Sequence, residues 1–122
     1  MASSAAGAIA DLDLLFRGFA DPTRLRILNL LAAGEMCVCD LVELLDLPQS
    51  TVSRHLRYLH RAGLVEVSRE WKFAHYRLAA PDLPVHRHLL GCVRTCFRDI
   101  KQLDRERAAA AARVRARADH PC

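Results

Sequence analysis

Two cysteines separated by one residue, Cys37 and Cys39, are the side chains of this sequence best suited to chemistry. Thiolates are soft ligands, so two of them this close in sequence can chelate one soft ion in preference to magnesium or calcium. A short helix is predicted to begin at Val38, which places Cys37 at its N-terminus, where backbone N–H groups and the helix dipole favour thiolate over thiol. Asp40 partly opposes this effect and can complete a cap. The pair predicts a soft-ion site, and redox chemistry is the alternative use of the same thiols.

Three further cysteines bring the total to five. Cys92 and Cys96 lie one turn apart on a predicted C-terminal helix and, with His88, share one face that could bind zinc or cadmium with a ligand from a partner subunit. For Cys96, packing as a small hydrophobe in an interface is an equal alternative. Cys122 ends a polar, arginine-rich segment and is taken as incidental. An odd cysteine count in a chain without a secretory signal favours reduced thiols.

The elements that position these residues are mostly helical. Asp21-Pro22 supplies an N-cap followed by proline at the first helical position, while Gly34 and Gly63 are suited to end helices. His55, beside an apolar stripe, is interpreted as a packed histidine rather than a ligand. The predicted helices run through 9–19, from Pro22 towards Gly34, through 38–45 and through 49–62.

Two short strands follow, at 64–69 and 73–78, both rich in branched and aromatic residues. They form a predicted hairpin whose tip lacks the glycine or asparagine that tight turns favour, so the turn type is left open. A last helix is predicted from about Asp82. Its apolar residues alternate at spacings of four and three, which suits packing against another helix in a dimer: Leu89, Val93, Cys96, Ile100 and Leu103.

This order predicts a mainly α fold with a small β-hairpin (α+β): four helices, two strands and a last helix, arranged as a winged helix-turn-helix that dimerises through its terminal helices. The predicted organisation is a flexible N-terminus at 1–8, a DNA-binding and dimerisation domain at 9–104 and an Ala/Arg-rich tail at 105–122.

The helix at 49–62 is the predicted reader of DNA. Gln49 can form hydrogen bonds with adenine, and Arg54 can form a bidentate hydrogen bond with guanine. Arg57 is suited to contact a phosphate. Small hydroxyl side chains and basic residues of the hairpin complete the predicted contacts: Ser50, Thr51, Ser53, Arg69 and Lys72.

Charge is distributed in agreement with this prediction. Residues 1–48 hold three basic and seven acidic side chains. Residues 49–77 hold six basic and two acidic side chains, and residues 78–122 hold nine basic and five acidic ones. A basic surface suits phosphate. No substrate or cofactor motif occurs, which argues against an enzyme and makes a thiol redox enzyme only a remote alternative. No apolar run reaches membrane-spanning length and no secretory signal begins the chain, so a cytoplasmic protein without membrane contact is expected.

Three segments resemble the ArsR/SmtB family of metal-responsive repressors: Asp21-Pro22-Thr23-Arg24, residues 49–56 and the hairpin. The segment 35–41, Glu-Met-Cys-Val-Cys-Asp-Leu, is similar to the cysteine box of the arsenic-responsive branch, with Met36 in place of leucine. The resemblance covers residues 9 to about 104. It implies a homodimeric repressor that needs no cofactor to bind a palindromic double-stranded operator and dissociates when As(III) or Sb(III) binds cysteine thiolates.

The sequence departs from that branch at Val42, where relatives often carry a third cysteine. Arsenite prefers three thiolates, so Cys92 or Cys96, of either subunit, is the predicted source of a third ligand. The family's interfacial zinc pattern is not reproduced by Asp82, His86 and His88. A cadmium-, zinc- or thiol-redox-responsive repressor of the same fold remains the alternative.

Overall fold

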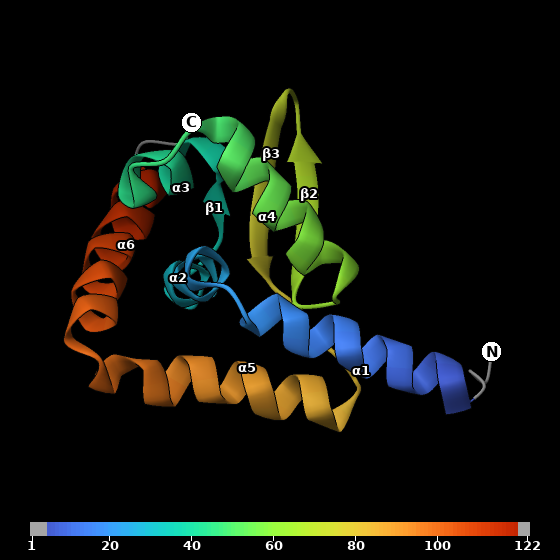
Figure 1. Ribbon diagram of the computed structural model, residues 1–122. Helices are drawn as coiled ribbons and strands as arrows, with labels where there is room; N and C mark the ends of the chain where they lie inside the picture. The colour runs from blue at the N-terminus through green and yellow to red at the C-terminus, as the bar shows by residue number, and fades with distance from the viewer. Residues whose placement is uncertain (1–4, 120–122) are drawn as a thin grey trace.

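Four helices make up most of the first half of the chain in this computed structural model, which describes residues 5–119 (Figure 1). The Asp21 side chain accepts a hydrogen bond from the Arg24 N–H at 3.1 Å, and Pro22 occupies the first turn, so the predicted start of the second helix is confirmed. The helices are α1 (Ala5–Phe19), α2 (Pro22–Leu31), α3 (Val38–Leu45) and α4 (Gln49–Arg61).

A three-stranded antiparallel sheet follows the order β1-β3-β2, with β1 at Met36–Cys37, β2 at Val65–Glu70 and β3 at Phe73–Leu78. The predicted hairpin of β2 and β3 is confirmed. Its tip is the two-residue turn Trp71-Lys72, and Trp71 adopts a left-handed backbone with φ of 64°, which is how the turn forms without glycine. Strand β1 was not predicted; it pairs Cys37 with His75 and so anchors the cysteine box to the sheet.

The core lies between the helices and the inner face of the sheet. Its centre is made of leucines and other aliphatic residues from α2, α3 and α4, which the helical periodicity predicts. Asn29 and Asp40 are two of the four buried polar side chains among the described residues, and both have charged partners from the C-terminal part of the chain. Polar contacts therefore fix that part against the core.

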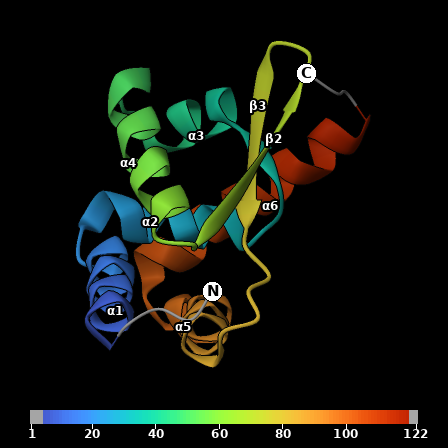
Figure 2. The same cartoon turned by 90° about the vertical axis from the view of Figure 1, so that its right-hand side faces the viewer.

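The C-terminal half differs from the prediction of one long helix. Helix α5 (Pro84–Cys96) ends in a 3₁₀ turn (Phe97–Asp99), after which the chain turns sharply and α6 (Lys101–Asp119) packs across α2 (Figures 1 and 2). Arg107 of α6 donates to the carbonyl oxygens of Val93 at 2.7 Å and Arg94 at 3.2 Å, which satisfies the end of α5. The predicted continuous seam is therefore wrong: Val93 is buried in the chain's own core, while Cys96 and Ile100 are exposed.

The segment predicted as a tail is largely helical, since α6 crosses the expected boundary at residue 104. Arg107 donates to Asn29 Oδ1 at 2.8 Å, and Arg26 Nε lies 3.0 Å from Glu106 Oε1. Ala110 of α6 is buried in the core, but most contacts of the helix are polar pairs between distant residues, which no apolar pattern in the sequence indicates. At the other end, α1 begins at Ala5, inside the expected flexible segment 1–8; residues 1–4 and 120–122, with Cys122, lie outside the described residues.

Candidate functional site

Helix α4 presents a polar face beside the β2–β3 hairpin (Figure 1). Val52, Leu56 and Leu59 point into the core, so the amphipathic pattern is used as predicted. The opposite face is polar: Gln49, Ser50, Arg54 and Arg57 are exposed, and Thr51 and Ser53 are half-buried. Arg69 and Lys72 are exposed on the hairpin.

A cleft of about 480 Å³ lies between α4 and the hairpin. Five of the eight residues predicted to contact DNA line it: Gln49, Ser53, Arg57, Arg69 and Lys72. Its lining holds three cationic side chains and no carboxylate. A cleft lined by one sign of charge concentrates counter-charge, so this one attracts anions. The other three predicted residues, Ser50, Thr51 and Arg54, lie on α4 outside this lining.

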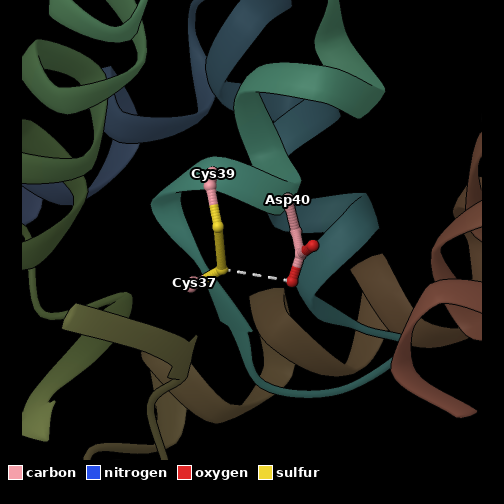
Figure 3. A group of neighbouring side chains, drawn as sticks. All are labelled: Cys37, Cys39 and Asp40. Atoms are coloured by element: carbon pink, nitrogen blue, oxygen red, sulfur yellow. Dashed lines mark hydrogen bonds between the residues drawn. A yellow bond between two sulfur atoms is a disulfide. The ribbon is translucent and has the colours of Figure 1, made fainter. Parts of the chain in front are cut away.

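The cysteine box opens onto the same cleft, because Cys37 and Cys39 also line it. Cys37 is the N-cap residue of α3, as predicted, but its side chain caps no backbone N–H. It is buried and forms a disulfide with exposed Cys39 (Figure 3). Cys37 Sγ lies 3.3 Å from Asp40 Oδ2, and this contact is a hydrogen bond only when Cys37 is a reduced thiol.

Asp40 joins the cysteine box to α6. Its side chain is 1% exposed, and its Oδ1 accepts hydrogen bonds from Arg113 at 2.9 Å and Arg117 at 2.8 Å. The hydrogen bond that Arg113 donates to Asp40, followed by the one it donates to Glu43, raises the pKa of Arg113 above its usual value. Two arginines therefore neutralise a buried carboxylate that touches Cys37, and no local pattern of the sequence indicates this because the partners lie more than 70 residues apart.

The donor atoms of Cys37, Cys39 and Asp40 lie within 4.8 Å of one another. This is the one group of three or more potential metal-binding side chains among residues 5–119. Two sulfurs within reach of one centre fit a soft metal or metalloid. A third thiolate is not among the three donors, as the valine at position 42 indicated.

Cys92 and Cys96 are exposed on α5. A hydrogen bond with Cys96 raises the pKa of the Cys92 thiol, which lowers its readiness to become a thiolate ligand. Helices α3 and α5 lie at opposite ends of the molecule in both views (Figures 1 and 2). One chain does not bring either cysteine to Cys37 and Cys39, so a role as third ligand would need a partner subunit.

His55 packs against α2, in agreement with its interpretation from the sequence. Its Nδ1 lies 3.3 Å from Arg24 Nη1 and 4.0 Å from Asp21 Oδ1. Burial lowers the pKa of His55 below its usual value, and the positive charges of Arg24 and Arg54 act in the same direction. The ring is therefore a packing group that joins the middle of α4 to the start of α2.

A polar helix set on a short preceding helix, with a basic hairpin beside it, defines a winged helix-turn-helix protein of the DNA-binding transcriptional regulators, and not an enzyme. The profile described as bacterial regulatory protein, arsR family, matches residues 21–67. The chain belongs to this ArsR family. Among residues 5–119, no helix has the length and apolar character needed to span a membrane.

Two relatives illustrate the similarity. An uncharacterised HTH-type transcriptional regulator of Methanocaldococcus jannaschii is 50% identical over 62 residues, which are 48% of this chain and 70% of that protein. The arsenical resistance operon repressor of Escherichia coli is 48% identical over 71 residues, 57% of this chain and 60% of the repressor. The match thus spans less than two thirds of that repressor. Other relatives are named as an SmtB homolog and a cadmium resistance regulator homolog.

The fold is also that of a solved structure, the homodimeric winged helix-turn-helix DNA-binding domain of a possible ArsR-family regulator from Mycobacterium bovis. The two chains are 32% identical, with a TM-score of 0.65, and the match covers 79% of this chain and 89% of the other. The predicted winged helix-turn-helix fold is confirmed.

Proposed function

We propose that this protein is a transcriptional repressor that binds a palindromic double-stranded operator as a homodimer. The exposed face of α4 would read bases in the major groove, and the basic hairpin would contact the adjacent phosphates. The similarity to the Escherichia coli repressor supports the direction of regulation.

Dimerisation is supported by apolar side chains of α1 that the single chain leaves in water. Ile9, Leu12 and Phe16 are exposed although they belong to the apolar stripe of the helix. An exposed apolar stripe indicates a covered surface in an assembly. The Mycobacterium bovis relative is described as homodimeric.

The inducer that the site supports best is As(III), or Sb(III), held by the thiolates of Cys37 and Cys39. One observation carries this proposal: the two sulfurs open onto the same cleft as Gln49, Arg57 and Arg69. Suppose that the inducer binds the free dimer more tightly than the DNA-bound dimer. The ratio of these two affinities is then also the factor by which the inducer lowers operator affinity, and the corresponding coupling free energy is typically about 1–3 kcal/mol.

Operator binding by the reduced protein tests this proposal. Cys37→Ser and Cys39→Ser should each bind the operator but resist release at the arsenite concentration that frees the wild type. Cys96→Ser tests separately whether a thiol of the partner subunit takes part, because Cys96 is exposed outside the cleft. Release of both box variants at the wild-type concentration would show that the box is not the sensor.

The disulfide of Cys37 and Cys39 favours a second candidate, a thiol-redox-responsive repressor. An oxidant such as a peroxide would take two electrons from the dithiol, which loses two protons as the S–S bond forms. Release by peroxide without arsenite, reversed by dithiothreitol, would support it. Cadmium or zinc is the other inducer to compare, because relatives include a cadmium regulator homolog.

A further inference from the structure

The cysteine box offers a metalloid two thiolates and no third sulfur within reach. Asp40 is the nearest further donor, but two arginines already hold one of its oxygens, and Arg117 Nε lies 3.4 Å from the other. Cys92 and Cys96 lie on α5, far from the box (Figures 1 and 2). Within one chain, the side left for a third ligand is the cleft, where Cys39 is exposed.

The cleft on that side has the size and charge of a small-molecule site. Its volume of about 480 Å³ lies within the range of ligand pockets. Arg57, Arg69 and Lys72 surround the opening of the dithiol, and the cleft lining holds no acidic side chain. A ligand that carries carboxylates would pair with these cations, whereas a cationic ligand would be repelled.

We propose that the cleft binds a low-molecular-weight anionic thiol, which supplies the third thiolate to As(III) held by Cys37 and Cys39. The proposal rests on the proposed function and specifies how that site is completed. The sulfur of the small thiol would take the open coordination position, and its carboxylates would pair with the cations of α4 and the hairpin. The cysteine box alone would then be only part of the effector site.

The ligand exchange balances without an oxidant. As(OH)₃ exchanges three As–O bonds for three As–S bonds, and the three thiol protons leave with the three hydroxides as three waters. Where the cysteines start as the disulfide, two molecules of the same small thiol reduce it, giving two cysteine thiols and one small-molecule disulfide. The oxidation state of arsenic does not change.

This arrangement gives the small thiol a part in release. Arg57, Arg69 and Lys72 are among the residues predicted to contact DNA, so carboxylates in the cleft would occupy cations that phosphates require. Inducer and operator would compete for one surface. Release would depend on the charge of the thiol present, and not only on arsenite.

The experiment measures complex formation without DNA. Reduced full-length protein is titrated with arsenite in the presence of glutathione, which is anionic, or cysteamine, which is cationic, and native mass spectrometry counts arsenic and small thiol per protomer. We expect one arsenic and one glutathione. The carboxylates of glutathione can form two exposed ion pairs with cations of the cleft. We therefore expect glutathione to be about tenfold more effective than cysteamine in completing the arsenic site.

Charge variants test the role of the cleft. Arg69→Gln combined with Lys72→Gln should reduce the preference for glutathione to about twofold, because two cations of the cleft are lost. Arg98→Gln combined with Lys101→Gln removes the same charge from exposed positions outside the cleft and should keep the wild-type preference.

The outcomes separate the two proposals. Arsenic bound without glutathione, whether completed by a partner cysteine, Asp40 or hydroxide, overturns this inference and leaves the proposed function standing. Equal retention of glutathione and cysteamine also overturns it. If the wild type retains no arsenic, or Cys37→Ser and Cys39→Ser retain as much as the wild type, the proposed inducer site itself fails.

Discussion

Replacing Asp40 by asparagine should separate the stability supplied by the buried carboxylate from that of ordinary surface charge. Asp40 is 1% exposed and accepts hydrogen bonds from Arg113 and Arg117. Asparagine keeps the shape and one acceptor oxygen but removes the charge. Both arginines then face an uncharged partner, and α6 loses its strongest attachment to α3.

The expected magnitude follows from burial. Removing one partner of a fully buried pair costs about 3–5 kcal/mol. The arginine side chains are 27% and 36% exposed, so water recovers part of this energy. We expect Asp40→Asn to lower the free energy of unfolding by about 2–3 kcal/mol.

Glu43→Gln is the matched control, because Glu43 lies on the same helix and also contacts Arg113, at 2.7 Å, but is 61% exposed. Its expected cost is under about 1 kcal/mol. Urea denaturation of the reduced protein at one fixed protomer concentration measures both variants, and Asp40→Asn should lower the midpoint by roughly 1 M or more. Equal midpoints for the two variants would refute the argument that burial makes the Asp40 contacts strong.

Three further substitutions test other parts of the structure. Arg54→Ala, on the exposed face of α4, should weaken operator binding by roughly 1–3 kcal/mol and relax base preference in gel-shift titrations against single-base operator variants; unchanged affinity would remove Arg54 from the interface. Burial lowers the pKa of His55 below 6.5, so the unfolded chain binds more protons as the pH falls below that value and the free energy of unfolding decreases. His55→Gln should flatten this decrease in denaturation series between about pH 5 and 7, and an unchanged slope would contradict the assignment. Gly34→Ala would place a Cβ 3.1 Å from Val114 Cγ1, at a residue with φ of 147°. Thermal unfolding should therefore show a loss of about 1 kcal/mol or more in the free energy of unfolding. A variant as stable as the wild type would show that α6 moves to make room for the methyl group.

Local signals explain what the sequence predicted correctly. The cap at Asp21, the amphipathic pattern of α4 and the alternation of the hairpin each depend on residues close together in the chain, and each was confirmed. The cysteine box was also placed correctly at the start of α3. Its shared cleft with Arg57 and Arg69 is tertiary, and the sequence could suggest it only through the order of elements.

The features that escaped prediction depend on distant partners or very short segments. Strand β1 has two residues, too few for a periodic pattern. The break after Cys96 and the course of α6 depend on Arg107, which binds Asn29 and the end of α5. Hydrogen bonds of this kind leave no apolar repeat in a sequence, so an arginine-rich segment is easily mistaken for a tail.

The return of α6 also affects the order in which the protein can fold as it is synthesised. Asp40 and Arg117 are 77 residues apart, and Asn29 and Arg107 are 78 apart. A nascent chain that has already formed the helix-turn-helix must hold the carboxylate of Asp40 without its counter-ions until α6 emerges from the ribosome. Because contacts so distant in sequence form late, the half of the molecule that reads DNA would be finished only after its last helix is made.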